Sequence, residues 1–511
     1  MESGAHMTSR SRFRHLLDRA PQDARAIEFE NVWMTWGQIR VIATSLDESL
    51  ASLGLDAGAR VGIVLEDRPE HVAALLGTIA GNRCVVTINP LRPPERMRAD
   101  IADAAVGALL ASPKMLEKIG AVTPPPVLLQ LTAEGAAAIT QPLPDLSVCE
   151  GLESSPGVTV EMLTSGTTGP PKRIAITDKQ FDAALATTVP TPPEGTLFRS
   201  GTTLVTTPLV HIGGFWGSLG PLYAGRSIVL LGKFDVDRWV DAVVRHRPRA
   251  VAMVPATLRA VLSAQVPAEK LASIEVATAG TAPVTVDLAE EMLDAYGIRV
   301  LPTYGATEFA GGVTAWTLKQ HREWWDRKKG SVGRALPGVE LRVVDEHGVG
   351  CPPGERGVLE IRGRQSPSGP HVWQRTSDVA SLDEDGFLWI HGRADDAIVR
   401  GGFKIHPDTV RSVLELHPGV REAAVAPLAD QRLGQVPVAA VERDPAGAEP
   451  VTTEALFALC RENLAPYEVP VQIAILDALP RTSAMKVSRP ALLEILRHEA
   501  ETQSTQERTS A

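Results

Sequence analysis

Short apolar runs alternate with stretches of helical periodicity through the first 330 residues. The runs Arg60–Leu65 and Ser227–Leu231 are almost continuously apolar, which is typical of parallel strands buried on both faces. Val41–Leu53 instead places apolar residues at i, i+3 and i+4 and stops at Gly54, as an amphipathic helix does. This alternation predicts an α/β fold with layered, mainly parallel sheets.

The same pattern predicts further elements before residue 330. We expect a helix over 71–79, strands over 83–87, 204–208, 275–279 and 299–302, and a buried strand over 250–254. Proline is frequent between Pro124 and Pro144, and we interpret that segment as a surface connection.

From about residue 330, apolar residues recur at every second position, which is the period of a β-strand. Glu340–Val344 and Gly357–Arg362 alternate between apolar and polar residues, and Asp385-Gly386 between apolar segments indicates a β-hairpin. Farther on, the pattern predicts helices over 407–416 and 454–464 and strands over 420–425 and 471–476. The last part of the chain is therefore predicted to be a compact α+β unit.

These changes of pattern suggest where the domains divide. A chain of 511 residues is longer than one hydrophobic core usually serves. We predict a large N-terminal domain over 8–393, made of layered α/β subdomains and a β-rich subdomain. A hinge over 394–396, a small mobile α+β domain over 397–496 and a disordered tail over 497–511 would follow.

Composition narrows the classes of function. The chain has 44% hydrophobic and 22% charged residues, as ordinary globular proteins do, and a net charge of −10. That charge disfavours binding to nucleic acid or to an anionic membrane, and we find no apolar run long enough for a transmembrane segment. The four cysteines lie far apart, which argues against a zinc site or a disulfide framework and favours the cytoplasm. We expect a monomer or a homodimer.

The segment Thr164–Lys172 is the richest in candidate chemistry. Its glycines permit close approach of the backbone, and its hydroxyls, amides and lysine can surround an anion. The spacing Gly166-x2-Gly169-x2-Lys172 differs from that of a Walker loop. A flexible polar linker is the alternative. The candidate anion-binding residues are Thr164, Ser165, Gly166, Thr167, Thr168, Gly169 and Lys172.

Three other predicted strands end in loops of small or hydroxylated residues. These loops begin at His211, at Gly280-Thr281-Ala282 and at Tyr304-Gly305. Ligands of open α/β sheets bind at the carboxyl ends of the strands. We therefore expect these loops and the segment Thr164–Lys172 to converge on one pocket.

Five motifs occur in a fixed order along the chain. They are Thr164–Lys172, Tyr304-Gly305-Ala306-Thr307-Glu308, Thr376-Ser377-Asp378, Gly392–Asp396 with Gly401–Ile405, and Lys486. As an ordered set they resemble the adenylate-forming superfamily of acyl- and aryl-CoA synthetases, peptide-synthetase adenylation domains and beetle luciferases. The resemblance covers about residues 20–495. It implies that a small carboxylic acid attacks the α-phosphate of ATP to give an acyl-adenylate, from which the thiol of coenzyme A displaces AMP.

The resemblance also implies roles for individual residues in the nucleotide site. The Thr164–Lys172 segment would hold the β- and γ-phosphates, Thr307 would contact the α-phosphate, and Glu308 would bind Mg²⁺. Tyr304 and Gly305 would face adenine from one side, with Gly280, Thr281 and Ala282 on the other. Asp378 would accept hydrogen bonds from the ribose hydroxyls, and Arg393 would lie near ribose and phosphate.

A second set of roles concerns the two half-reactions. By resemblance, Lys486 bridges the carboxylate and the α-phosphate during adenylation, although a lysine read alone is more commonly a solvated surface residue. Asp395 matches the hinge about which the C-terminal domain rotates. The rotation would then present the loop of Gly401, Gly402, Phe403 and Lys404 for thioester formation.

The sequence gives less information about which carboxylic acid is the substrate. His211 matches a gate beside the carboxylate, but it could simply pack in a turn. We expect the acyl pocket to be bordered by Phe215, Trp216, Phe309, Gly311 and Gly312, although aromatic clusters are also ordinary core. Because no acidic residue lies within 211–216 to meet an ammonium group, we predict an apolar aromatic, alicyclic or medium-chain acid.

Three residues depart from the pattern of the superfamily. Arg173 stands where glycine is usual after the loop lysine, Thr409 replaces a common glutamate, and Met485 replaces the glycine before the lysine. Two alternatives therefore stay open beside a carboxylate–CoA ligase. One is an acyl-AMP ligase that loads a separate carrier protein, and the other is a degenerate nucleotide- or acyl-binding homologue.

Overall fold

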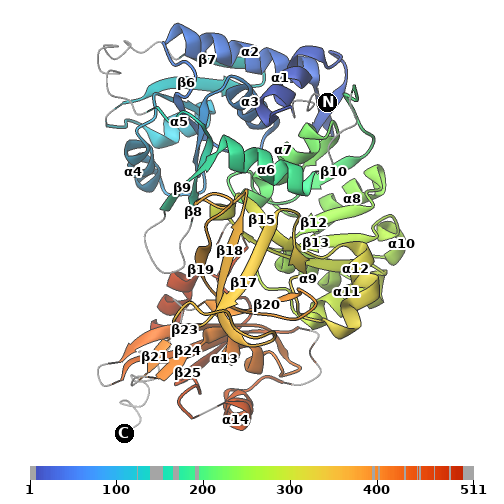
Figure 1. The fold of residues 1–511 in the computed structure, drawn as a ribbon, viewed down its shortest axis with the longest axis vertical. Helices are drawn as coiled ribbons and strands as arrows, with labels where there is room; N and C mark the ends of the chain where they lie inside the picture. Colours follow the sequence, from blue (N-terminus) through green and yellow to red (C-terminus); the bar gives the residue numbers. More distant parts are fainter. Residues whose placement is uncertain are drawn as a thin grey trace. The chain divides into compact units, whose positions relative to one another are not determined.

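The fold is described from a computed structural model (Figure 1). It describes residues 7–498 except 124, 139–153, 165–171, 190–194, 394–397, 401–402, 431–432, 446, 448–449, 465 and 483–484. The chain divides into two compact units, which are treated separately below. The first takes in the described residues up to Glu340 together with Ile361–Gln374, and the second takes in Leu341–Glu360 and the described residues from Arg375 onward.

The first unit contains a seven-stranded sheet in the order β7-β6-β5-β3-β4-β8-β9. Its strands are β3 (Arg60–Val64), β4 (Cys84–Ile88), β5 (Ala108–Ala111), β6 (Val127–Thr132), β7 (Gly135–Ala138), β8 (Val158–Thr164) and β9 (Lys172–Thr177). β3 is parallel to β4 and β5, and both β3 and β4 are fully buried, as their apolar runs predict. β8 and β9 are antiparallel, and the candidate anion-binding segment joins them.

Helices cover this sheet. They are α1 (Ser9–Arg19), α2 (Trp36–Ser52), α3 (Pro69–Ala80), α4 (Pro94–Ala104), α5 (Pro113–Ile119) and α6 (Asp178–Thr188). Figure 1 shows α1, α2 and α3 grouped beside β6 and β7. α2 begins earlier than its apolar pattern predicts, because Thr35 and Gln38 form a capping box that satisfies the first backbone N–H groups.

A four-stranded sheet in the order β10-β11-β1-β2 adjoins these elements. Its strands are β1 (Arg25–Phe29), β2 (Val32–Thr35), β10 (Thr202–Val205) and β11 (Ser227–Leu230), and two helices follow, α7 (Ile212–Tyr223) and α8 (Val236–His246). β10 is parallel to β11, so α7 is the crossover between them. His211 is the N-cap residue of α7 and therefore lies beyond the carboxyl end of β10.

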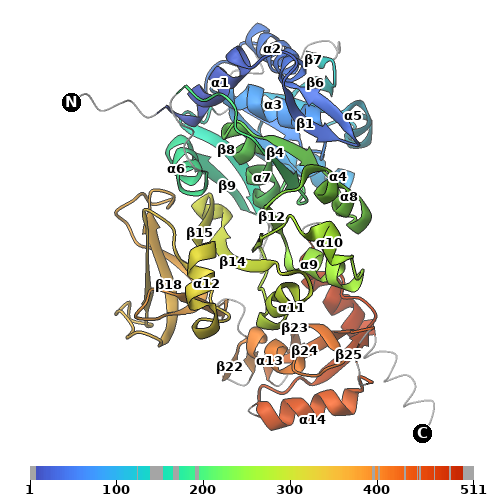
Figure 2. The same ribbon diagram turned by 90° about the vertical axis from the view of Figure 1, so that its right-hand side faces the viewer.

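A five-stranded sheet in the order β12-β13-β14-β15-β16 completes the sheets that lie wholly in the first unit. It comprises β12 (Ala250–Met253), β13 (Val276–Ala279), β14 (Arg299–Ala306), β15 (Gly311–Ala315) and β16 (Arg334–Ala335). Its helical segments are α9 (Pro255–Ser263), α10 (Ala268–Leu271), α11 (Val286–Tyr296), α12 (Leu318–Trp324) and the 3₁₀ turns η2 (Thr307–Phe309) and η3 (Trp325–Arg327). Figure 2 shows α9, α10 and α11 grouped near β12 and β14.

The next sheet has four strands in the order β17-β18-β19-β20. Its strands β19 and β20 are antiparallel. Its strands are β17 (Val339–Val344), β18 (Arg356–Gly363), β19 (Gln374–Leu382) and β20 (Leu388–Arg393). A turn closed by the bond from Asp383 N–H to the Phe387 carbonyl joins β19 to β20, with Gly386 at φ 79°. This is the hairpin that Asp385-Gly386 predicts.

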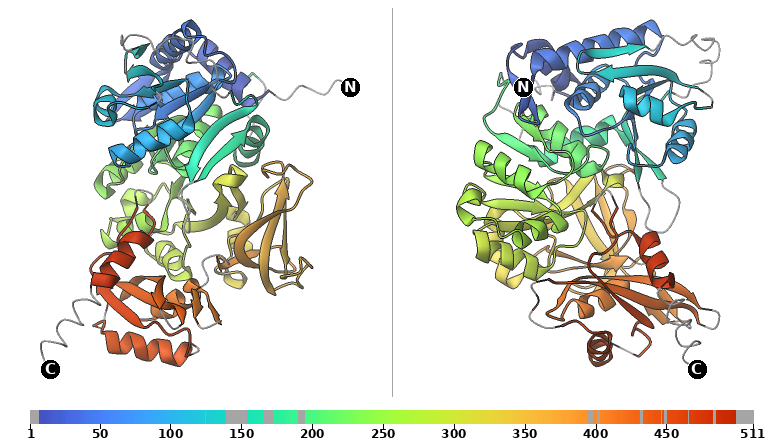
Figure 3. Two further views of the ribbon diagram at one scale, coloured as in Figure 1. Left: turned by 90° about the vertical axis from the view of Figure 1, so that its left-hand side faces the viewer. Right: turned by 180° about the vertical axis from the view of Figure 1, so that it is seen from behind.

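The C-terminal part of the second unit is an α+β structure, as predicted (Figure 3). β21 (Ile398–Arg400), β22 (Phe403–Ile405), β23 (Val420–Asp430), β24 (Gly434–Arg443) and β25 (Gln472–Leu476) form one sheet. α13 (Pro407–Leu414), α14 (Thr453–Asn463) and a helix over 489–498 accompany it. Cys460 and Leu456 on α14 are fully buried in the core of this part.

Two sequence predictions about this architecture are wrong. The proline-rich segment after Pro124 is not a bare connection, because it contains β6, whose residues alternate between buried and partly buried, and β7, which contacts α2. The run 250–254 is not fully buried either. β12 is the first strand of its sheet, and Ala250 and Ala252 are exposed on its open face. Among the helices that the structure describes, none is long and apolar enough to cross a membrane.

Candidate functional site

Two of the predicted loops meet at the start of α7. A Cβ atom added to Gly213 would lie 3.6 Å from Cγ2 of Thr207 and 3.9 Å from Cγ2 of Thr281. Thr281 follows β13 and takes a left-handed conformation with φ 67°, which is uncommon for a β-branched residue. The loop that follows β10 and the loop that follows β13 therefore lie side by side.

The loop after β13 also contacts β14. A Cβ atom on Gly280 would lie 2.5 Å from Oγ1 of Thr303, so no larger residue fits there without movement. Thr303 immediately precedes Tyr304, whose side chain is half-buried. Three of the four loops expected to converge, at His211, Gly280 and Tyr304, are thus neighbours in the first unit.

Glycine lets β14 and β15 approach closely at the turn that carries Glu308. Gly305 and Gly312 face each other in register, and a Cβ atom on Gly305 would overlap the carbonyl oxygen of Gly311. Between the strands, η2 presents the exposed Glu308 side chain, and Ala310 closes the turn with φ 53°. The close approach of the β15 backbone therefore explains why residue 305 is a glycine.

Aromatic side chains pack behind this turn. Nε1 of Trp216 donates a hydrogen bond of 2.7 Å to the Ala310 carbonyl, and the Trp216 ring lies 4.7 Å from that of Phe181. Phe215 is fully buried and Phe309 is 4% exposed, so both belong to the core, whereas Trp216 is half-buried. The role of these rings in an acyl pocket stays a prediction.

The side chain of Gln180 is hydrogen-bonded to the main chain of the turn that carries Glu308. Its Nε2 donates to the Glu308 carbonyl at 3.4 Å and to the Gln365 carbonyl at 3.1 Å, and Nε2 of Gln365 donates to the Phe309 carbonyl at 3.3 Å. Gln180 lies on α6, directly after the strand that begins at Lys172. The sequence shows it only as the glutamine of a capping box with Thr177, so its second role was missed.

Arg173, the first departure from the superfamily pattern, has a structural partner. Its guanidinium is ion-paired with Asp100 on α4, and its Nη1 donates to the Thr87 carbonyl at 3.3 Å. Asp100 is 7% exposed, and burial raises the pKa of its carboxyl group while Arg173 opposes that rise. Arg173 therefore ties β9 to β4 and α4.

In the second unit, Asp378 and Arg393 face each other in register on β19 and β20. Oγ1 of Thr376 accepts a hydrogen bond of 3.1 Å from the Asp378 N–H group. The pKa of Lys486 is lowered, first by the protein atoms that crowd its ammonium group and then by the positive charge of Arg393, although the side chain keeps access to solvent. Asp378 and Arg393 are thus cross-strand partners, and the charge of Arg393 acts on Lys486.

A tight turn precedes Lys486. Arg481 and Val487 form an isolated antiparallel bridge, and the Thr482 N–H group donates to the Lys486 carbonyl at 2.7 Å. Met485 takes a left-handed conformation with φ 60°, in the region that glycine occupies at no steric cost. The departure at Met485 therefore falls on a backbone conformation that disfavours the residue present.

Several predicted site residues lie outside the described part of the chain. They are Ser165, Gly166, Thr167, Thr168, Gly169, Asp395, Gly401 and Gly402. Thr164, Phe403 and Lys404 are placed in strands by their backbones only, and Lys172 begins β9. The predicted tail also lies almost entirely beyond the described residues.

The carboxylate of Glu308 is compatible with Mg²⁺ that arrives on a nucleotide. Within the described ranges, no three His, Cys, Asp or Glu side chains are grouped so that they could hold a metal ion. Mg²⁺ is usually bound by one or two carboxylates together with substrate phosphates, and it keeps several waters. A single exposed carboxylate beside Thr307 fits that mode of binding.

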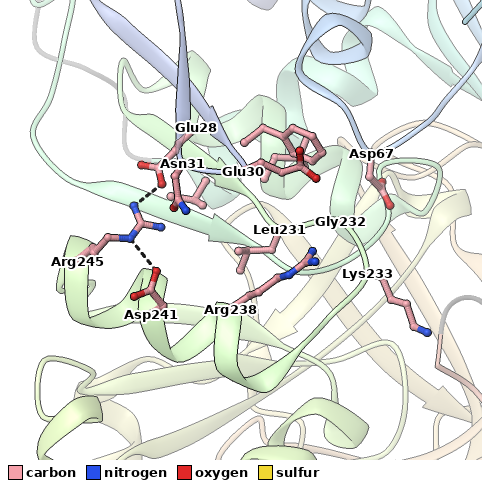
Figure 4. Close-up of a pocket in the computed structure, with 13 residues that line it drawn as sticks. Glu28, Glu30, Asn31, Asp67, Leu231, Gly232, Lys233, Arg238, Asp241 and Arg245 are labelled. Atoms are coloured by element: carbon pink, nitrogen blue, oxygen red, sulfur yellow. Dashed lines mark hydrogen bonds and ion pairs between the residues drawn. The ribbon is translucent and has the colours of Figure 1, made fainter.

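A pocket of about 470 Å³ lies at the carboxyl ends of β1 and β11 (Figure 4). Charges of both signs line it, and Arg245 pairs with Glu28 and Asp241 in one wall. Oδ1 of Asp67 accepts a hydrogen bond of 2.7 Å from the Leu209 N–H group, two residues before His211. Burial raises the pKa of Asp67.

Comparison with known proteins identifies the family. The AMP-binding enzyme family matches residues 13–369, and the C-terminal domain of AMP-binding enzymes matches residues 410–486. A 2-succinylbenzoate–CoA ligase of Bacillus pumilus is 28% identical over 494 residues, which span 93% of this chain and 96% of that protein. A feruloyl-CoA synthase of an Amycolatopsis species is 29% identical over 484 residues, which span 92% and 95%.

Solved structures show the same fold. An o-succinylbenzoate CoA synthetase of Bacillus subtilis in complex with its acyl-adenylate intermediate has a TM-score of 0.73 and 25% identity, covering 94% of this chain and 97% of that one. ATP-bound MatB from Rhodopseudomonas palustris has a TM-score of 0.78 and 24% identity, covering 96% and 99%. The predicted fold class, layered α/β with a small C-terminal α+β domain, is confirmed. This chain belongs to the AMP-binding enzyme family.

Proposed function

We propose that this protein is an ATP-dependent carboxylate–CoA ligase that forms an acyl-adenylate and then a thioester. The observation that carries the proposal is that Asp378 lies opposite Arg393 on β19 and β20, while the positive charge of Arg393 helps to lower the pKa of Lys486. These are the residues that the superfamily uses around ribose, phosphate and the reacting carboxylate. The names of the relatives agree, since they are CoA ligases and synthetases, one of them in complex with ATP and magnesium ion.

In the first half-reaction, a carboxylate oxygen forms a bond to the α-phosphorus of ATP while the bond to pyrophosphate breaks. Two anions must meet, so a cation between them lowers the barrier, and Lys486 would supply that cation. Thr307 and the segment Thr164–Lys172 would orient the phosphates. Mg²⁺, held by Glu308, would neutralise charge on the phosphate oxygens.

In the second half-reaction, the coenzyme A sulfur bonds to the acyl carbon, the thiol loses its proton and AMP leaves. The loop of Gly401, Gly402, Phe403 and Lys404 would border the passage for the thiol after rotation at Asp395. Since both ATP and coenzyme A are intracellular substrates, we infer that the reaction takes place in the cytoplasm.

We infer that the substrate is an apolar acid, aromatic, alicyclic or medium-chain. Trp216 is the partly accessible aromatic residue beside the Glu308 turn, and no carboxylate lies within 211–216 to attract an ammonium group. The relatives include ligases named for 2-succinylbenzoate and ferulate, and this favours the aromatic members of the class. His211 would lie beside the carboxylate as a gate.

A panel of carboxylic acids assayed for release of pyrophosphate and AMP, with and without coenzyme A, tests this function. We expect at least one apolar acid to drive pyrophosphate release, and AMP release to require coenzyme A. If no acid in a broad panel supports ATP–pyrophosphate exchange, the protein is neither a carboxylate–CoA ligase nor an acyl-AMP ligase. AMP release with a carrier protein but not with coenzyme A would instead favour the second candidate, an acyl-AMP ligase.

A further inference from the structure

Two carboxylates face each other in the sheet of the C-terminal part. Glu422 on β23 and Glu442 on β24 are partners in the antiparallel register, and Glu442 is 5% exposed. Like charges directly opposite each other on neighbouring strands are destabilising, and burial increases the cost. A cation is therefore needed at this position.

Arg481 provides that cation. Its Nη2 lies 2.6 Å from Oε2 of Glu422 and 3.2 Å from Oε2 of Glu442. The Leu479 N–H group also donates to Oε2 of Glu442 at 2.9 Å, and Nη1 of Arg421 lies 3.5 Å from its Oε1. The end of the Arg481 side chain is thus fixed to the sheet, because it is paired with both carboxylates at once.

The other arm of the same guanidinium holds the turn before Lys486. Nη1 of Arg481 donates to the Met485 carbonyl at 3.3 Å. Met485 also donates its N–H to the Thr482 carbonyl at 2.9 Å, which fixes its left-handed conformation. A planar guanidinium can serve both partners simultaneously, whereas an ammonium group is a single compact charge.

We propose that Arg481 is a positioning residue for Lys486. The carboxylate pair Glu422/Glu442 anchors Arg481 to the sheet, and Arg481 in turn fixes the peptide that leads into Lys486. This inference rests on the proposed function of Lys486 in adenylation. The contacts of Arg481 are with Glu422, Glu442 and the Met485 carbonyl, so its loss should displace the lysine without removing it.

The kinetic test compares Arg481→Lys with Arg421→Ala and Lys486→Ala. Arg481→Lys keeps a cation at the carboxylates but loses the second arm, and we expect kcat for adenylation to fall by about 10²-fold, as a displacement near 1 Å can cause. The KM for ATP and the rate of thioester formation from supplied acyl-AMP should not change. Arg421→Ala, which removes a cation from Glu442 outside the turn, should leave the ratio of the two half-reactions unchanged.

The outcomes separate this inference from the proposed function. An equal loss of both half-reactions in Arg481→Lys would show a merely structural role, and an unchanged adenylation rate would also overturn the inference. If Lys486→Ala keeps full adenylation, the proposed role of Lys486 fails instead.

A second measurement needs no substrate. Reductive methylation with ¹³C-formaldehyde makes the pKa of Lys486 observable by NMR, with its resonance identified by absence from Lys486→Ala in each background. Arg393 and the surrounding protein lower this pKa. Arg481→Lys should return it toward the ordinary value near 10.4. An unchanged pKa of Lys486 in Arg481→Lys would contradict the positioning role.

Discussion

Met485 stands at a backbone position where we expect glycine to be more stable than alanine. Its φ of 60° is left-handed, which costs an L-residue roughly 1–2 kcal/mol relative to the right-handed conformation. Its side chain is 41% exposed, and Met485→Ala removes the same buried part of it, so comparison with that variant cancels the loss of packing. Glycine carries its own cost of about 0.5–1 kcal/mol, because it has more freedom in the unfolded chain. The difference predicts that the free energy of unfolding of the C-terminal part is about 0.5–1 kcal/mol higher in Met485→Gly than in Met485→Ala.

Hydrogen exchange measured by mass spectrometry on peptides from β24 reports this free energy. β24 lies inside the C-terminal sheet between β21 and β23, so its amides exchange only when that part opens. The predicted gain corresponds to exchange that is about two- to fivefold slower. Met485→Ala is the matched control, because alanine also loses the side chain but keeps the left-handed cost. Equal effects of the two substitutions, or faster exchange in Met485→Gly, would refute the assignment of strain to this backbone.

Three further outcomes follow from the first unit. Arg173→Gly should lower the free energy of unfolding by about 3–5 kcal/mol, because it leaves the buried Asp100 without its cation, and Asp100→Asn in the same chain should recover part of that loss in urea titrations. Burial and the nearby Arg299 lower the pKa of His321 to about 4. The unfolded state therefore binds more protons between pH 6.5 and 4, and stability should fall by about 3 kcal/mol over that window relative to His321→Phe, in which no such difference is expected. Gly305→Ala should weaken nucleotide binding measured by calorimetry, whereas Gly350→Ala, where nothing lies within 4 Å of an added Cβ, should have no effect.

Apolar patterning predicts the interior strands better than the peripheral ones. β3, β4 and β11 are found from their runs because strands within a sheet and under helices need apolar residues on both faces. β12 carries alanines at the positions that face outward, and its composition alone does not distinguish an outer strand from an inner one. β6 and β7 were missed because neighbouring prolines suggest a connection, although the alternating residues between them form a hairpin.

In the candidate site too, some features could be predicted from the sequence and others could not. His211, Gly280 and Glu308 follow or connect strands, as the ends of the apolar runs predict. The register that sets Asp378 opposite Arg393 could not be read from the motifs, since a bulge within the hairpin shifts the pairing between Val379 and Ala380. Gln180 was missed because its partners are main-chain carbonyls, which leave no signature in a sequence.

The two departures nearest the predicted chemistry differ in how the structure accommodates them. Arg173 is accommodated by a buried carboxylate on α4, so a charged residue in place of glycine adds a tie between elements and leaves backbone geometry undisturbed. Met485 keeps the left-handed backbone suited to glycine, and the described contacts of its turn are main-chain bonds and one arm of Arg481. A change at Arg173 should therefore act on stability. A change at Met485 or Arg481 should act also through the placement of Lys486, and hence on adenylation.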